Sequence, residues 1–250
     1  MASNRLAGLS ALVTGAGGGI GGAIAQRFVA EGARVIGLDI AGEGAGFSLL
    51  ACDVRNPGAV ERTVADAAQR NGGIDILVTA AARTGGRAAF PDVTDDEWDA
   101  YIEVNLSGTF RVCRAVARLM IEQKRGGSII TVGSVNSLVA ERAALPYVSS
   151  KGGIALLTKA MAVDLATDGI RANMIAPGPV EVPRNAELFG SPAFRRGFAT
   201  TVPMGHSAEP ADVANAAVYL AEPASRMVTG TTLLVDGGLL AQVPPFDTAP

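Results

Sequence analysis

The stretch from Val13 to Ala23, VTGAGGGIGGA, constrains the fold more than any other part of this sequence, because it places six glycines in eleven residues. Glycine has no Cβ, so the chain can turn sharply there and its N–H groups can approach another molecule closely. The residues before the turn form an apolar run, and those from Ile20 onward carry apolar side chains near helical spacing until Gly32. The pattern predicts a strand, a glycine turn and then a helix.

A second β-rich run, RVIGLDI, follows this predicted helix and places Asp39 near its end. A dinucleotide-binding βαβ unit has the same order of features: a strand, a glycine turn, a helix, a second strand and an acidic residue. In such a unit the pyrophosphate lies at the helix N-terminus and the acid binds the adenosine ribose.

The uncharged window from Leu6 to Ala25 is about as long as a membrane span. Seven glycines in that window argue against a membrane span and against an export signal.

The composition fits a protein with a large core and a small-molecule partner. Of 250 residues, 48% are apolar and 18% are charged, with a net charge of -3. The sequence shows no basic patch of the kind that indicates nucleic-acid binding. Cys52, Cys113 and His206 are the only cysteines and histidine, so we expect neither a metal site nor a disulfide framework, and we expect a cytoplasmic location.

Short apolar runs alternate with helical patterns along the chain, which predicts one domain over residues 1–250 with a doubly wound, Rossmann-type parallel sheet of seven strands and helices on both faces. The predicted strands are Ala11 to Thr14, Arg34 to Leu38, Ser48 to Ala51, Ile74 to Thr79, Ser128 to Val132, Ile170 to Ile175 and Thr231 to Val235. Residues 183–203 interrupt the alternation and are predicted to form a lid or binding loop. The tail over residues 241–250 is expected to be irregular.

Tyr147 and Lys151 are four residues apart on a helix predicted to begin near Pro146, so they share a face. Ser134 lies thirteen positions before Tyr147, directly after the predicted fifth strand. Open α/β sheets bind ligands beyond the carboxyl ends of their strands. We therefore expect these three side chains to lie at one ligand site.

With these residues, the chain resembles the short-chain dehydrogenase/reductase family across nearly its whole length. The resemblance is carried by seven motifs in order: TGAGGGIG at Thr14 to Gly21, ACDV with Asp53, EVNLSGTF with Asn105, IITVGSVNS with Ser134, YVSSK at Tyr147 to Lys151, IRANMIAPG with Asn173, and VDGG at Val235 to Gly238.

The resemblance implies an NAD-dependent alcohol dehydrogenase or carbonyl reductase. Tyr147 would be the acid/base, Lys151 would lower its pKa and hold the nicotinamide ribose, and Ser134 would hold the substrate oxygen. Asn105 would order a water relay from Lys151 to solvent. The alternative for Asn105 is a helix asparagine that satisfies backbone groups.

The resemblance also implies the cofactor contacts. Gly15, Gly19 and Gly21 would surround the diphosphate beside Ile20, and Asp39 would accept hydrogen bonds from the ribose. Neither Gly18 nor Ile40 offers a base for a 2′-phosphate, which favours NAD over NADP. The remaining expected contacts lie near the adenine and the nicotinamide: Asp53, Val54, Ala81, Pro177, Gly178 and Val180, with Tyr147 and Lys151. The alternative for Asp53 is a turn or cap aspartate.

Two positions depart from the family pattern. The family commonly has Asn-Asn-Ala-Gly after strand four, where this chain has Thr79, Ala80, Ala81 and Ala82. A threonine that binds the nicotinamide carboxamide often follows Pro177 and Gly178, but this chain has Val182. We expect the turn beside the cofactor to be held differently.

The substrate is predicted to be a secondary alcohol or ketone, in a pocket formed by Val135, Asn136, Glu141, Arg142, Pro179 and Arg184. Asn136 and Glu141 suit a sugar or polyol, whereas the arginines of the lid suit a 3-oxoacyl thioester or a carboxylate. A non-catalytic NAD-sensing or scaffold protein is the alternative from another class. The resemblance implies a homotetramer with two kinds of two-fold contact, one through the long helices after Asp95 and Pro146 and one near the last helix and strand.

Overall fold

The computed structural model describes residues 4–242, and within that range seven parallel strands form one sheet in the order β3-β2-β1-β4-β5-β6-β7. This confirms the predicted doubly wound Rossmann-type sheet. The strands are β1 (Ser10–Thr14), β2 (Arg34–Asp39), β3 (Ser48–Ala51), β4 (Ile76–Thr79), β5 (Gly127–Val132), β6 (Ile170–Pro177) and β7 (Thr232–Val235). The strand order reverses at β1 and β4, where such sheets bind ligands.

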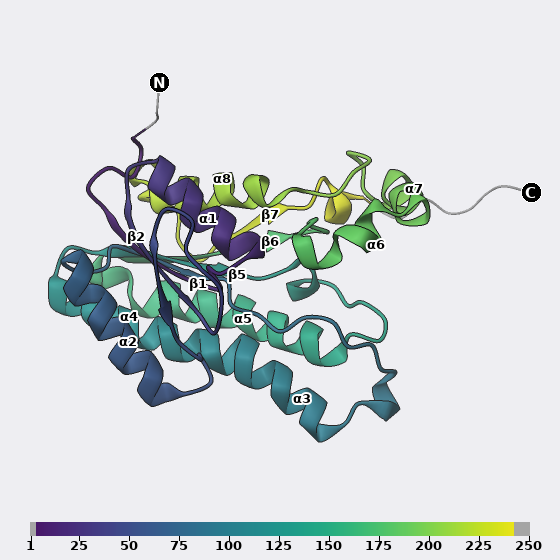
Figure 1. Cartoon of the computed structure of the whole chain (residues 1–250), viewed down its shortest axis with the longest axis horizontal. Helices are drawn as coiled ribbons and strands as arrows, with labels where there is room; N and C mark the ends of the chain where they lie inside the picture. The colour runs from purple at the N-terminus through teal and green to yellow at the C-terminus, as the bar shows by residue number, and fades with distance from the viewer. Residues whose placement is uncertain (1–3, 243–250) are drawn as a thin grey trace, which may run out of the picture.

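Helices cover both faces of the sheet (Figure 1). On one face lie α1 (Gly19–Ala30) and α8 (Pro210–Ala221), and on the other lie α2 (Pro57–Asn71), α4 (Gly108–Gln123) and α5 (Leu145–Asp164). Two apolar clusters fill the two interfaces. Val13, Val78 and Ile130 pack toward α1 and α8, and Leu12 and Leu77 pack toward α2 and α4. Successive strand residues thus face opposite layers, as strand geometry requires.

The fourth strand is two residues shorter than predicted. It begins at Ile76 because the backbone of Ile74 is paired with a side chain instead of a neighbouring strand. The Gln123 amide accepts the Ile74 N–H at 2.8 Å and donates to the Ile74 carbonyl at 2.8 Å. Ile74 remains a core residue, which explains its apolar character.

Residues 183–203 contain two short helices, α6 (Ala186–Gly190) and α7 (Pro192–Thr201), after a turn of 3₁₀ helix at Pro183–Asn185. The rings of Phe189, Phe194 and Phe198 pack on one another with centroids 5.0 to 5.2 Å apart. This segment therefore has an apolar cluster of its own. Of the tail over residues 241–250 predicted to be irregular, Ala241 is the last residue of a 3₁₀ turn, Leu239–Ala241, and residues 243–250 lie outside the described range.

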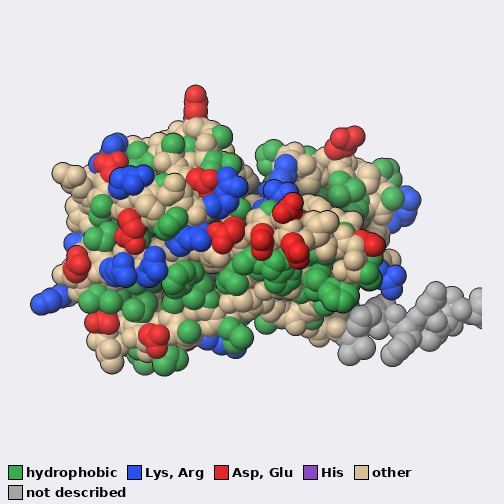
Figure 2. Space-filling model, turned by 90° about the horizontal axis from the view of Figure 1, so that it is seen from below, with side chains coloured by type: hydrophobic (Ala, Val, Ile, Leu, Met, Phe, Trp, Pro, Cys, Tyr) green, Lys and Arg blue, Asp and Glu red, His purple; other side chains and the backbone are tan. Residues whose placement is uncertain are grey.

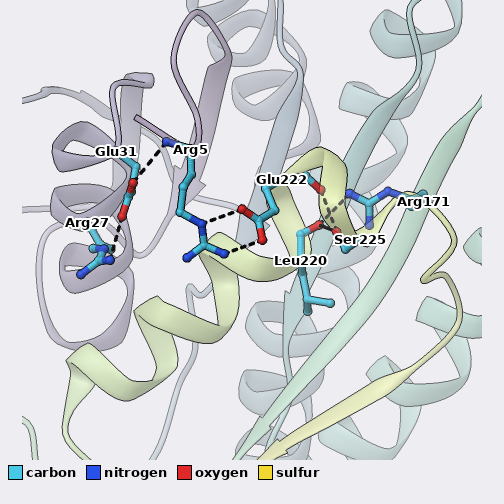
Figure 3. A network of polar contacts seen from close by, with 7 residues as sticks. All are labelled: Arg5, Arg27, Glu31, Arg171, Leu220, Glu222 and Ser225. Atoms are coloured by element: carbon cyan, nitrogen blue, oxygen red, sulfur yellow. Dashed lines mark hydrogen bonds and ion pairs between the residues drawn. The ribbon is translucent and has the colours of Figure 1, made fainter. Parts of the chain in front are cut away.

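A polar network ties the start of the chain to the ends of α1 and α8 (Figure 3). The guanidinium of Arg5 makes two hydrogen bonds to the Glu222 carboxylate, and the backbone N–H of Arg5 donates to the Glu31 carboxylate at 3.3 Å. The Leu220 carbonyl accepts from Arg171 at 2.7 Å and from Ser225 at 3.1 Å. Because Arg171 lies near the start of β6, this network holds the edge of the sheet opposite to the strand ends that carry the site.

Within residues 4–242, no helix combines the length and the apolar character needed to cross a membrane.

Candidate active site

The glycine turn between β1 and α1 has no room for side chains at two of the predicted positions, Gly15 and Gly21. A Cβ on Gly15 would lie 2.7 Å from the backbone of Ala80, and one on Gly21 would lie 2.2 Å from the Gly15 carbonyl oxygen. Gly15 and Gly19 also have left-handed φ angles of 70° and 54°. The turn is therefore built from glycine for packing and for backbone conformation, and it leaves the first N–H groups of α1 at a cavity.

This cavity has a volume of about 830 Å³ and runs along the carboxyl ends of the central strands. Ten of the predicted cofactor residues line it: Gly15, Gly19, Ile20, Gly21, Asp39, Asp53, Val54, Ala81, Tyr147 and Lys151. A smaller cavity of about 160 Å³ adjoins it and is lined by the other three, Pro177, Gly178 and Val180. The structure thus brings together residues that are more than 150 positions apart in the sequence.

Asp39 and Asp53 both face the large cavity, but in different ways. The Asp39 carboxylate accepts the N–H of Gly17 at 3.0 Å and that of Ile40 at 2.7 Å, which fixes it beside the glycine turn. Asp53 forms an ion pair with Arg55 at 2.7 Å, and this hydrogen-bonded guanidinium lowers the pKa of Asp53. The Asp53 carboxylate also accepts the backbone N–H of Arg55 at 2.9 Å, which is the turn role that was the alternative to an adenine contact.

Ser134, Tyr147 and Lys151 meet where the two cavities join. Ser134 follows β5 and its hydroxyl accepts the N–H of Asn136 at 3.1 Å, which caps a 3₁₀ turn and orients the side chain. Tyr147 and Lys151 lie one turn apart on α5. The Lys151 Nζ donates to the Val132 carbonyl at 2.9 Å and lies 5.7 Å from the centre of the Tyr147 ring.

Burial dominates the protonation of both titratable groups. Burial raises the pKa of Tyr147 above its ordinary value, although the hydrogen bond to Ser134 and the charge of Arg184 act in the opposite direction. Burial, with a smaller effect of Arg184, lowers the pKa of Lys151 to about 8. Among this chain's own groups, the field expected to lower the Tyr147 pKa is thus outweighed by desolvation.

Asn105 lies at the centre of a π-helical segment, Ile102–Ser107, between α3 (Asp95–Tyr101) and α4. Its side chain is fully buried, accepts the Arg83 N–H at 2.7 Å, and donates to the Arg83 carbonyl and the Ser150 hydroxyl at 3.1 Å each. The amide is thus occupied by protein groups, as in the structural alternative. π-Helical insertions are frequent at functional sites, and this one turns Asn105 inward.

The Asn105 contact also positions two residues that the sequence interpretation missed. Arg83 lines the large cavity, and its guanidinium lies 5.5 Å from the centre of the Tyr101 ring. The Tyr101 ring packs edge to face on Tyr147, with centroids 6.4 Å apart. No local motif marks either residue, because their contacts depend on how α3 and α5 pack.

The turn after β4, where this chain has alanines, is held by a side chain of another strand. The hydroxyl of Thr14, from the neighbouring β1, accepts the N–H groups of Ala80 and Ala81 at 3.1 and 3.2 Å. The Thr79 hydroxyl is buried without a hydrogen-bond partner in the described residues. At the second departure, Asn185 holds the turn by accepting the Val182 N–H at 2.7 Å.

Of the predicted substrate residues, Arg184 lines both cavities, whereas the other five line neither: Val135, Asn136, Glu141, Arg142 and Pro179. Asn136 donates to Glu141 at 2.9 Å, and Glu141 forms an ion pair with Arg87 at 2.5 Å. The polar groups that suggested a sugar are thus engaged with each other.

Residues 4–242 contain no cluster of three or more histidine, cysteine, aspartate or glutamate side chains arranged to hold a metal ion. Cys52 and Cys113 are both buried free thiols. Burial raises the pKa of Cys113 to about 12, so its thiol is unreactive near neutrality.

The sheet order, the glycine turn and the Ser134, Tyr147 and Lys151 arrangement define a nicotinamide-dependent oxidoreductase of the Rossmann type. Residues 15–240 match the family model described as Enoyl-(Acyl carrier protein) reductase. The chain belongs to the short-chain dehydrogenase/reductase family.

Named relatives differ in what they act on. The 3beta-hydroxysteroid dehydrogenase 1 of Eggerthella lenta is 36% identical, with 94% of each chain covered. The D-threitol dehydrogenase of Mycolicibacterium smegmatis is also 36% identical, again with 94% of each chain covered. A gluconate 5-dehydrogenase from Burkholderia cenocepacia, solved in complex with NADP and tartrate, has a TM-score of 0.88 at 36% identity, covering 97% of this chain and 99% of that one. The comparisons therefore establish an oxidoreductase, with the substrate differing among relatives.

Proposed function

We propose that this protein is an NAD-dependent dehydrogenase of secondary alcohols, or reductase of the matching ketones, acting on a sugar- or polyol-like substrate. The support for this substrate class is the likeness to the D-threitol and gluconate 5-dehydrogenases, since Asn136 and Glu141 line neither cavity. The observation that carries the proposal is the meeting of Ser134, Tyr147 and Lys151 beside a glycine-lined cavity of about 830 Å³. A site of this kind has a place for a dinucleotide and a proton donor in adjoining space.

The residues present fit a nicotinamide dinucleotide. The glycine turn supplies a close backbone approach, with Gly15, Gly17 and Gly21 at positions where a Cβ would clash, and the N-terminus of α1 favours an anionic diphosphate. Asp39 supports NAD over NADP, because a 2′-phosphate near its carboxylate would be repelled. The gluconate 5-dehydrogenase structure contains NADP, so cofactor preference is part of the proposal.

When bound, the oxidised nicotinamide supplies the hydride acceptor for the alcohol carbon. Ser134 would hold the substrate oxygen by a hydrogen bond while Tyr147 accepts the hydroxyl proton at its phenol oxygen. Operation near neutral pH requires lowering the Tyr147 pKa by about three units from 10, or about 4 kcal/mol of preferential phenolate stabilisation. Lys151 and Arg184 are the cations of this chain that would contribute to it.

A 3-oxoacyl thioester reductase is the second candidate, supported by the 37% identity to the 3-oxoacyl-[acyl-carrier-protein] reductase of Salmonella typhimurium. A non-catalytic NAD-binding protein is the candidate from another class, since a fold alone does not determine function. The complete set of Ser134, Tyr147 and Lys151 favours an enzyme over this candidate.

The proposal is tested by following reduced nicotinamide absorbance with NAD and a panel of secondary alcohols, sugars and polyols, and in reverse with ketones and 3-oxoacyl thioesters. We expect turnover with at least one alcohol. Preference for a thioester would favour the second candidate. Calorimetric binding of NAD with no turnover of any compound would contradict the proposed enzyme and support the non-catalytic candidate.

We also propose a homotetramer in the cytoplasm. Figure 2 shows hydrophobic side chains in a band across the face that carries α4 and α5. On α5, Leu156 and Val163 are 69% and 77% exposed, which is high for such side chains. A closed oligomer would cover this band. The proposed location in the cytoplasm rests on a separate observation, the two buried free thiols, which are consistent with a reducing compartment.

A further inference from the structure

Arg184 is the charged side chain of the smaller cavity. The described residues around this space are mostly apolar or glycine, and they include Ser134 and Tyr147. Arg184 is the one among them that carries a formal charge at neutral pH. A substrate whose reacting oxygen lies on Ser134 and Tyr147 would therefore meet a single charged neighbour.

The Arg184 guanidinium has no hydrogen-bond or ion-pair partner among residues 4–242. Other arginines do: Arg5, Arg27, Arg55, Arg70, Arg87, Arg111 and Arg125 each form an ion pair with a carboxylate. The nearby carboxylate of Glu141 is already paired with Arg87. Positive charge at this end of the site is thus left uncompensated. It acts to lower the pKa of Tyr147, although burial outweighs it there, and it adds to the lowering of the Lys151 pKa by burial.

The backbone that carries Arg184 is held in place. Asn185 accepts the Val182 N–H at 2.7 Å and donates to the Val180 carbonyl at 3.0 Å, which closes the Pro183–Asn185 turn. Phe189, the next buried residue, packs on Phe194 and Phe198. The guanidinium therefore projects from a fixed point at the base of the lid.

We propose that Arg184 is a specificity residue that binds an anionic oxygen group, the carboxylate of a small hydroxy acid or sugar acid, while Ser134 and Tyr147 hold the reacting oxygen. This inference rests on the proposed function and narrows its substrate class. A planar guanidinium matches a carboxylate with two parallel hydrogen bonds. The cavity volume of about 160 Å³ is small for a drug-sized ligand, which favours a short substrate.

The cofactor diphosphate is the other anion within this site, because Arg184 also lines the large cavity. The two sources differ in what they predict. If Arg184 binds a substrate carboxylate, removing its charge should lower kcat/KM for acids and leave NAD affinity unchanged. If it binds the diphosphate, removing its charge should weaken NAD binding and lower kcat/KM equally for every substrate.

The test compares Arg184→Gln with Arg195→Gln as a matched control. Arg195 lies on α7 of the same lid, is exposed, and lines neither cavity. The probes are matched pairs of one shape, 3-hydroxybutyrate with 3-hydroxybutyramide and gluconate with gluconamide, with NAD affinity measured by calorimetry. Arg184→Lys, which keeps the charge but loses the planar fork, is the conservative variant.

The wild type is expected to prefer the acid of at least one pair by about tenfold or more in kcat/KM, as one charge-assisted contact allows. Arg184→Gln should abolish that preference with the NAD Kd unchanged, Arg184→Lys should keep part of it, and Arg195→Gln should keep all of it.

The inference is overturned if Arg184→Gln retains the preference for the acid, if it weakens NAD binding by about tenfold or more, as loss of a phosphate contact would, or if the wild type prefers the amides or only uncharged alcohols. Each of these results overturns the role of Arg184 and leaves the proposed dehydrogenase intact. Absence of turnover with every alcohol would overturn the proposed function as well.

Discussion

Lys151 is 3% exposed and its amine is bonded to one carbonyl, so the folded protein bears the cost of a buried charge. With its pKa lowered from 10.5 to about 8, the lysine is charged in both folded and unfolded chains below pH 8, where this cost is complete. Between those two values the folded chain binds fewer protons than the unfolded chain, so stability rises with pH and the cost disappears.

Lys151→Met should therefore raise the free energy of unfolding at pH 7 by about 1 to 3 kcal/mol, even though it leaves the Val132 carbonyl without its donor. The gain should shrink between pH 8 and 10. Urea unfolding at several pH values measures it. A variant less stable than the wild type at pH 7 would show that the buried amine is net stabilising.

Asp39 is the residue on which the cofactor preference depends. We expect kcat/KM with NAD to exceed that with NADP by about tenfold or more, equivalent to about 1.4 kcal/mol. Asp39→Asn keeps the shape and removes the charge, so it should narrow this ratio. Adding Gly18→Arg should reverse it, because a Cβ at Gly18 would meet no atom within 4 Å.

Asp53→Asn is the control for this series, since Asp53 also lines the cavity but is paired with Arg55. The ratio should stay close to the wild-type value in that variant. Equal efficiency with both cofactors in the unmodified protein would refute the preference for NAD.

At the scale of elements, the π-helical segment between α3 and α4 links the fold to the site through Asn105. Asn105→Leu removes both hydrogen bonds to the Arg83 backbone and should cost about 2 to 3 kcal/mol of stability. It should also reduce kcat by about tenfold, as displacement of a positioned site wall does, because Arg83 and Tyr101 would move relative to Tyr147. Steady-state kinetics below the melting temperature measures the second effect.

Asn173→Leu provides the matched control. Asn173 is equally buried and also bridges backbone groups, donating to Val228 at 2.8 Å and accepting from Thr231 at 3.1 Å, between β6 and β7. It should lose similar stability while its kcat stays near that of the wild type. An equal fall of kcat in both variants would indicate that Asn105 acts through stability alone.

Some elements of the fold can be predicted from the sequence, and others cannot. The glycine turn and the strands follow from local patterns, since each apolar run lies between breakers. The start of β4 does not, because Gln123, 49 positions away, pairs with Ile74. The sequence likewise does not predict that Glu141 pairs with Asn136 and Arg87, because polar residues in a loop carry no periodicity that identifies their partners.

The site shows the same division. Ser134, Tyr147 and Lys151 could be named because their spacing is short and their elements are regular. Arg83, Tyr101 and Asn185 could not, since their roles depend on how separate elements pack. The catalytic roles themselves stay a prediction from the resemblance.

At the scale of the whole molecule, we expect a tetramer of about four times the 25.4 kDa chain mass. Leu156 and Val163 lie two turns apart on one face of α5. The double variant Leu156→Glu and Val163→Glu should disrupt this face and leave a dimer through the second contact. Light scattering at micromolar concentration distinguishes the species.

Phe90→Glu serves as the control, because Phe90 is 75% exposed but lies outside both long helices. It should leave the wild-type mass unchanged. A wild-type protein that scatters only as a single chain would reject the tetramer.

The most direct measurement of the central claim is Tyr147→Phe, assayed for calorimetric NAD binding and for steady-state oxidation of the best alcohol. The change removes one oxygen and keeps the ring that packs on Tyr101. We predict unchanged NAD affinity and a fall in kcat of at least about a hundredfold, the lower end for loss of a positioned acid/base. Retained NAD binding with near wild-type turnover would show that Tyr147 does not transfer the proton and would contradict the mechanism.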